Sequence, residues 1–147
     1  MRSPLSAVVC GVSLAACLPL AGCQNGSLQG MFGQSAMDLL SPFLKDAANS
    51  YINNLKSVAT QLAGVRSLTD AVAVAPKIEP AAKDVRTAYN TLSAATPQER
   101  KLLWEAFGPK LDSANSDFVS QAARIEGESL WGRVLSAGLD QVKLFSK

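Results

Sequence analysis

The chain has 147 residues, 48% of them hydrophobic, and its 14 basic side chains nearly balance 12 acidic ones. Arg2 is the only charged residue before Asp38, so the rest of the chain is close to neutral. A near-neutral chain without basic runs lacks the phosphate-binding surface that nucleic-acid recognition requires. Histidine, the commonest general base and a frequent zinc ligand, is absent from the sequence. We therefore expect no nucleic-acid partner, no metal and no cofactor.

The first residues follow the pattern of a secretory signal. Arg2 provides the positive end, and residues 5–18 form a run of apolar and small side chains. A helix that spans a bilayer needs about 20 predominantly apolar residues. Here Pro19 interrupts the run, and polar residues begin at Gln24. The pattern therefore favours a cleaved signal over residues 1–22 rather than a retained membrane helix.

The signal ends in Leu20-Ala21-Gly22-Cys23, which resembles the lipobox of bacterial lipoproteins. The resemblance implies that the Cys23 thiol receives a diacylglyceryl group through a thioether. A signal peptidase recognising Leu20, Ala21 and Gly22 then cuts before Cys23, and the freed amine is acylated, for example with palmitate. A thiol suits this chemistry because it is a strong nucleophile at neutral pH. The expected product is a chain held on a membrane by its N-terminal lipid.

A second copy of the motif, Leu14-Ala15-Ala16-Cys17, lies six residues earlier. A cut before Cys17 would shorten the apolar segment and leave a mature chain that begins with apolar residues. A cut before Cys23 leaves a longer apolar segment and a polar, flexible start. We therefore assign the lipid to Cys23 and keep Cys17 as the alternative. Because Cys10 and Cys17 would leave with the signal, no disulfide is expected.

Two further parts of the chain are predicted after the signal. Residues 23–34 contain three glycines and no charge, which is typical of a flexible tether behind the lipidated cysteine. Residues 35–147 show helical periodicity and hardly any alternating pattern. We expect an all-α domain, a small antiparallel bundle of about four helices joined by short loops.

The first helix is predicted from Ser41-Pro42 to Gly64, with serine as N-cap, proline in the first turn and glycine as the stop. Its apolar positions repeat with heptad spacing over three repeats. They are Leu44, Ala48, Tyr51, Leu55, Val58, Leu62 and Val65, and Ala47, Ile52 and Ala59 lie beside them. So wide an apolar stripe indicates a helix in a bundle.

Two shorter helices are predicted next. The pattern Ser67-Leu68-Thr69-Asp70 is typical of a capping box, and the apolar helix that it opens should end by Pro76. A separate helix should then run from Pro80 to Ala95. Its inward positions are Ile78, Ala81, Val85, Ala88 and Leu92.

The clearest helix start is Thr96-Pro97-Gln98-Glu99, which combines an N-cap, a proline in the first turn and a glutamate at the third helical position. The inward positions that follow are Leu103, Phe107, Leu111, Ala114, Phe118, Ala122 and Ile125. Proline clashes with the carbonyl four residues back, so Gly108-Pro109 should break or kink this helix. A last amphipathic segment spans Ser129 to Phe145, with Trp131, Leu135, Leu139, Val142 and Phe145 on one side.

The sequence contains no recognisable catalytic constellation. No Gly-x-Ser-x-Gly motif is present, and the carboxylates are scattered at spacings that fit helix caps and solvated faces better than catalysis or calcium binding. Tyr51, Tyr89, Trp104 and Trp131 could line a ligand groove, although packing into the core is the commoner role of such side chains. We therefore expect no enzyme activity.

These observations predict a membrane-anchored lipoprotein of the cell envelope with a non-enzymatic interaction or structural domain and a protein partner there. The alternative is a periplasmic module that binds lipid or unfolded protein in an apolar groove between its helices. By resemblance to lipoproteins, Gln24 in place of an aspartate after the cysteine implies the outer membrane, facing the periplasm. In an organism with a single membrane, the implied place is the cell membrane.

Overall fold

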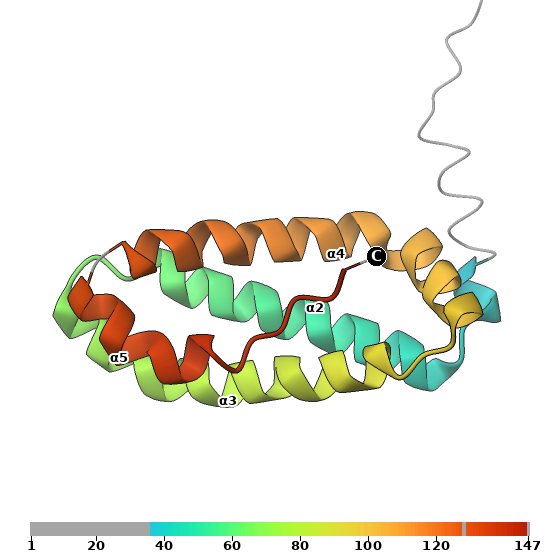
Figure 1. Cartoon of the computed structure of the whole chain (residues 1–147), viewed down its shortest axis with the longest axis horizontal. Helices are drawn as coiled ribbons and strands as arrows, with labels where there is room; N and C mark the ends of the chain where they lie inside the picture. The colour runs from blue at the N-terminus through green and yellow to red at the C-terminus, as the bar shows by residue number, and fades with distance from the viewer. Residues whose placement is uncertain (1–35, 128, 147) are drawn as a thin grey trace, which may run out of the picture.

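The computed structural model describes residues 36–127 and 129–146 (Figure 1). After a helical turn over residues 36–39, the chain forms α2 (Pro42–Ala63), α3 (Leu68–Ser93), α4 (Pro97–Glu126) and α5 (Ser129–Leu139). The all-α prediction is confirmed, because the described residues outside these helices form only turns and irregular segments. Within the same ranges, no helix has both the length and the apolarity needed to cross a membrane.

Two predicted parts of the chain lie outside the described residues. One is the signal over residues 1–22, which includes Leu20, Ala21 and Gly22. The other is the tether over residues 23–34, which begins with Cys23. The structure therefore tests only the helical domain predicted for residues 35–147.

The three long helices lie side by side with α2 between the other two. α2 packs along both α3 and α4, and α5 packs mainly along α3. In Figure 1 the chain reverses direction between α2 and α3 and again between α3 and α4. α5 covers the end of the molecule where α2 ends and α3 begins. The far half of the space between α3 and α4 is thus left without a helix over it.

α2 has the limits and the buried face that its sequence predicts. The Ser41 hydroxyl caps the helix by accepting from the main-chain N–H of Leu44 at 3.3 Å, and Gly64 follows the last helical residue. The whole heptad seam is buried in the core, namely Leu44, Ala48, Tyr51, Leu55, Val58, Leu62 and Val65. Burial of apolar surface stabilises by about 25 cal/mol per Å², so this seam is a main source of the stability of the domain.

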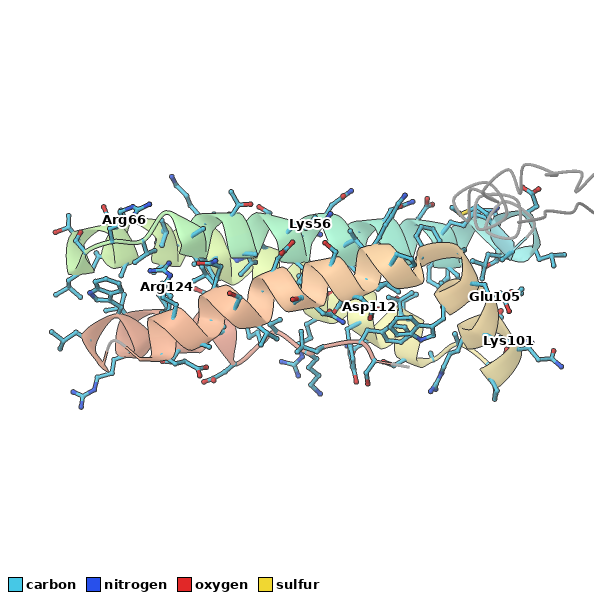
Figure 2. All side chains as sticks on the ribbon, turned by 90° about the horizontal axis from the view of Figure 1, so that it is seen from above. Lys56, Arg66, Lys101, Glu105, Asp112 and Arg124 are labelled. Carbon is cyan, nitrogen blue, oxygen red and sulfur yellow. The ribbon has the colours of Figure 1, made fainter. Side chains whose placement is uncertain are left out.

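The carboxyl end of α2 is capped from another helix. The guanidinium of Arg124, near the end of α4, donates hydrogen bonds to the main-chain carbonyls of Leu62 and Val65. Figure 2 shows Arg124 on the side of α4 that faces α2. The last carbonyls of a helix lack intrahelical partners and carry partial negative charge, so a cation placed there is stabilising. This cap ties the ends of α2 and α4 together.

The predicted division of the second helical region at Pro76 and Pro80 is wrong. One helix, α3, runs from Leu68 to Ser93 and contains both prolines. The two prolines are four residues apart, so they lie on one face of the helix, and both are exposed. The opposite face is buried in the core and includes Ile78 and Val85. A proline inside a helix costs about 3 kcal/mol or more, and the burial of this face is the term that offsets it.

α4 begins with the predicted capping box. The Thr96 hydroxyl accepts from the Glu99 N–H at 3.3 Å, and a Glu99 carboxylate oxygen accepts from the Thr96 N–H at 2.9 Å. These hydrogen bonds favour the charged carboxylate, so they hold the pKa of Glu99 below its ordinary value. The local sequence alone was sufficient to predict this helix start.

The predicted break or kink at Gly108-Pro109 is a kink. α4 continues through Pro109 as one element, and Figure 2 shows it changing direction between Glu105 and Asp112. A Cβ atom at Gly108 would lie 3.3 Å from a ring carbon of Trp104. Glycine therefore leaves room for the indole to lie against the turn that follows it.

The last helix is shorter than the amphipathic segment predicted over Ser129–Phe145. α5 ends at Leu139, residues 140 and 141 form a turn, and residues 142–146 have no regular secondary structure. Phe145 is nevertheless buried, as its place on the apolar side predicts. Its ring is buried between α2, α3 and α4 although the segment that carries it is irregular.

The two glycines of α5 provide a matched pair for testing how closely α5 approaches α3. A Cβ atom at Gly138 would lie 2.8 Å from Cγ2 of Ile78, whereas one at Gly132 would meet nothing closer than 3.6 Å. Overpacking costs about 1–3 kcal/mol, and alanine gains about 1 kcal/mol in helix propensity over glycine. We expect Gly138→Ala to lower the free energy of unfolding by about 1 kcal/mol and Gly132→Ala to leave it unchanged or raise it. Chemical denaturation followed by circular dichroism measures both, and equal effects would contradict the close approach at Gly138.

Candidate functional site

The C-terminal segment, residues 140–146, follows α5 and enters the space between α3 and α4. Main-chain hydrogen bonds from Gln141 to Gly138 and from Val142 to Leu139 close the turn at the end of the helix. Figure 1 shows the segment running between α3 and α4 in front of α2, toward the first turns of α4. We call the space that it occupies the C-terminal groove. Its walls are α3 and α4, and its floor is α2.

Phe145 is the side chain that anchors the segment in this groove. It is 4% exposed and contacts one aromatic ring from each of the three long helices. It stacks on Trp104 of α4, with ring centroids 5.9 Å apart and an angle of 6° between the planes. Tyr51 of α2 and Tyr89 of α3 meet it edge to face at 6.5 and 6.4 Å. Such pairs add about 0.5–1.5 kcal/mol each beyond the area that they bury.

The main chain of Phe145 is also bound in the groove, by hydrogen bonds to two side chains. Its N–H donates to the Tyr51 hydroxyl at 2.9 Å, and its carbonyl accepts from Nδ2 of Asn115 at 2.9 Å. The Tyr51 hydroxyl in turn donates to Oδ1 of Asn115 at 2.9 Å, and the carbonyl of Lys143 lies 3.2 Å from the same hydroxyl. Tyr51, which is buried, and Asn115, which is partly buried, thus form a polar pair that binds both the N–H and the carbonyl of Phe145.

Electrostatics keep this polar pair neutral. Burial of Tyr51 raises the pKa of its hydroxyl, an effect larger than the opposing one of the hydrogen bond from Phe145. Asn115 carries an amide, which does not titrate in this range. Nearby, the Lys143 ammonium lies 5.8 Å above the centre of the Tyr89 ring, within the range of a cation–π contact. A neutral phenol and an amide are poor proton-transfer groups, so the arrangement is suited to binding.

The structure brings together three of the four aromatic residues predicted as groove or core candidates. Tyr51, Tyr89 and Trp104 surround Phe145, whereas Trp131 lies on α5 and packs partly buried against the core. Asn115 is a groove residue that the sequence analysis did not identify. Its only signal was an amide next to the inward positions of α4, and nothing local indicates that its partner lies 30 residues further on.

A pocket opens beside the same indole. It has a volume of about 630 Å³ and is lined by Pro97, Arg100, Lys101, Trp104 and Glu105. Nε1 of Trp104 is buried and has no hydrogen-bond partner among the described residues. The indole N–H is therefore a donor that residues 142–146 do not use.

The acidic residues have local roles. The Asp70 carboxylate accepts from the main-chain N–H of Arg66 at 3.0 Å, and this bond with the Ser67 contacts lowers its pKa. Within residues 36–127 and 129–146, no three acidic, histidine or cysteine side chains are grouped as a metal site requires.

The described domain thus offers one built site, the C-terminal groove, whose polar and aromatic groups bind an extended chain. Comparison with protein-family models, with curated proteins and with solved structures finds no match for this chain.

Proposed function

We propose that this protein is a lipoprotein of the cell envelope, anchored through Cys23, whose helical domain binds another protein and performs no catalysis. The domain would be an antiparallel bundle of about four helices, displayed on the outer membrane and facing the periplasm. The single observation that carries the proposal is Leu20-Ala21-Gly22-Cys23 at the end of an apolar signal segment. A lipid with two or three acyl chains anchors stably, because each buried methylene contributes about 0.8 kcal/mol.

The described domain supports the binding part of this proposal. In the groove, Tyr51 and Asn115 bind the main-chain N–H and carbonyl of Phe145 and do not surround a reactive group. Next to the tether, Leu39 and Phe43 are 73% and 70% exposed. Large apolar side chains this exposed, which follow the tether in the sequence, are available for contact with a partner on the same membrane.

The anchor is tested by replacing each candidate cysteine in the full chain. We expect Cys23→Ser to abolish incorporation of radiolabelled palmitate and to leave the precursor uncut, because no other atom in the motif can form the thioether. Cys17→Ser is the matched control and should be labelled and cut as the wild type is. Labelling that survives in Cys23→Ser but is lost in Cys17→Ser would move the anchor to Cys17.

The binding function is tested on membranes. Chemical cross-linking followed by affinity purification of the full chain should recover a defined partner, and its recovery should fall in Cys23→Ser, which lacks the lipid anchor. If the same proteins are recovered from both chains, the anchor has no part in the interaction. If neither chain gives a defined partner, the proposed interaction function is wrong.

The groove-binding alternative is favoured by a different observation. The groove between α3 and α4 is lined by aromatic rings and already holds an extended chain, the C-terminal segment. A module that binds lipid or unfolded protein here would first have to release that segment. An apolar dye titrated into the full chain should then bind weakly until the segment is removed.

A further inference from the structure

We propose that the C-terminal groove is a binding site for an extended segment of a partner protein, with an aromatic residue at the position of Phe145. Residues 142–146 of this chain would occupy the site as an intramolecular ligand until the partner displaces them. The inference rests on the proposal that the domain acts by binding, and it is independent of the lipid anchor. It names the chemistry of the partner: an extended chain, an aromatic side chain and a cation two residues before it.

The groove holds the segment mainly through its main chain and through one side chain, Phe145. The hydrogen bonds to Lys143 and Phe145 come from the Tyr51 and Asn115 side chains. Every residue except proline presents an N–H and a carbonyl to such groups, so they accept many sequences. Selectivity comes from the ring cluster, because only an aromatic side chain repeats the stacking on Trp104. Binding of main chain by polar groups and of one side chain by a pocket is a general mode of peptide recognition.

Residues 142–146 can leave the groove while α2, α3 and α4 stay packed together. α2 packs directly along α3 and α4, and the buried seam between them includes Leu55, Leu62 and Leu111. Leu144 is 40% exposed and Ser146 is exposed, so the outer side of the segment faces solvent. Of residues 142–146 only Phe145 is buried, and elements with few buried side chains open at a lower free-energy cost than the core. Release of residues 142–146 should therefore be a local event.

The segment leaves one hydrogen-bond donor of Trp104 and one pocket beside Trp104 unused. Nε1 of Trp104 is a buried donor without a partner among the described residues, and the pocket of about 630 Å³ lies beside the same ring. Phe145 stacks on Trp104, which also lines this pocket, so the end of the segment lies beside it. A longer chain could continue into the pocket and supply an acceptor for the indole N–H. Such a ligand would bind more tightly than the segment now in place.

The geometry favours a partner protein over the tail of a second copy. Phe145 lies six residues after Leu139, the last residue of α5, so a donated tail carries it at most about 21 Å from the end of its own α5. The donor would therefore have to bring its α5 to a groove whose entrance already holds the α5 of the acceptor. A segment from an unrelated chain meets no such restriction.

The test measures binding of a peptide to the full chain purified in detergent. The probe is the fluorescently labelled heptapeptide Gln-Val-Lys-Leu-Phe-Ser-Lys, which copies residues 141–147. In wild type, the tethered segment competes at an effective concentration in the millimolar range, which weakens the apparent affinity of the probe. Phe145→Ala removes the competing anchor and leaves the groove intact. We expect the probe to bind Phe145→Ala with a micromolar Kd and at least about tenfold more tightly than wild type.

Three controls test whether binding of the probe depends on the groove and on the phenylalanine of the peptide. The chain with Leu144→Ala, which changes an exposed neighbour, should bind the probe as weakly as wild type does. A heptapeptide with alanine in place of phenylalanine should not bind Phe145→Ala. Adding Asn115→Ala to Phe145→Ala should weaken binding of the probe, because the hydrogen bond that the Asn115 amide donates to the main-chain carbonyl is lost. Absence of probe binding to a helical, cooperatively melting Phe145→Ala chain would overturn the inference, and so would binding that ignores the phenylalanine of the peptide.

A second measurement keeps Phe145 in place and so does not depend on that variant folding. A spin label attached at Leu144→Cys reports whether the segment is immobilised in the groove or free. Millimolar heptapeptide should convert the immobile spectrum into a mobile one, and the alanine heptapeptide should not. An unchanged spectrum would contradict displacement, and conversion accompanied by dimers in size-exclusion chromatography would assign the groove to a second copy of the chain.

Discussion

Replacing Phe145 by alanine should lower the free energy of unfolding by about 3–5 kcal/mol, the usual cost of truncating a buried phenylalanine. Phe145 is 4% exposed and contacts rings from α2, α3 and α4. Its loss therefore removes dispersion contacts with all three helices at once. The helices themselves should remain, because the seam of α2 with α3 and α4 does not include Phe145.

Two measurements check this expectation. Chemical denaturation followed by far-ultraviolet circular dichroism gives the free energy, and hydrogen exchange reports whether the C-terminal segment is still protected. Leu144→Ala is the matched control, since surface substitutions stay within about 0.5 kcal/mol of wild type. A loss in Phe145→Ala no larger than the loss in Leu144→Ala would show that Phe145 does not anchor the segment.

Replacing Tyr51 by phenylalanine should cost about 2–3 kcal/mol although it removes a single oxygen atom. The hydroxyl accepts from the Phe145 N–H and donates to Asn115. Without it, the buried Phe145 N–H and the partly buried amide oxygen of Asn115 lose their partners, and an orphaned buried group costs about 1–3 kcal/mol. The ring itself is retained, so the edge-to-face contact with Phe145 should persist. Adding Asn115→Ala should then cost less than it does in wild type, because both residues belong to one network.

The same substitution should change how stability depends on alkaline pH. Burial raises the pKa of the Tyr51 hydroxyl in the folded chain above its unfolded value of about 10. The neutral hydroxyl therefore contributes stability that is complete below about pH 10 and is lost as pH rises toward the folded pKa. Above pH 10, the free energy of unfolding of Tyr51→Phe should fall less steeply with pH than that of wild type. Identical slopes would show that Tyr51 does not titrate as a buried group.

Much of the helical framework was predictable because it depends on local chemistry. The Ser41 and Thr96 caps and the heptad seam of α2 all involve groups within one or two helical turns of each other. Repeating apolar residues at helical spacing place one face toward a core, whichever helix covers it. These predictions therefore hold without knowledge of the partner helix.

The prolines of α3 show where local reasoning fails. Their cost was assessed for an isolated helix, in which a proline removes a hydrogen bond and clashes with the preceding turn. In the folded chain Pro76 and Pro80 lie on an exposed face, while Ile78 and Val85 are buried on the other side. This burial depends on packing against other helices, so it cannot be read from the residues around the prolines.

The candidate site was predictable only in part for the same reason. Tyr51, Tyr89 and Trp104 could be named as aromatic candidates, but their meeting point depends on Phe145, which is 94 residues from Tyr51 along the chain. Asn115 gave no local signal, because an amide on a helix is ordinary until its partner is known. Helical spacing placed Phe145 on an apolar face, yet its ring reaches the core from an irregular segment.

The sequence by itself determined the all-α class, the first helix and its buried seam, the start of α4 and the lipid-anchor hypothesis at Cys23. Each follows from residues close together in the chain, where capping, periodicity and motif chemistry act. Only the tertiary structure decided that α3 passes through its prolines, that Arg124 caps α2 and that the C-terminal segment fills the groove between α3 and α4. These features depend on contacts between residues that are distant in the sequence. Such contacts stabilise the chain only once the helices have packed.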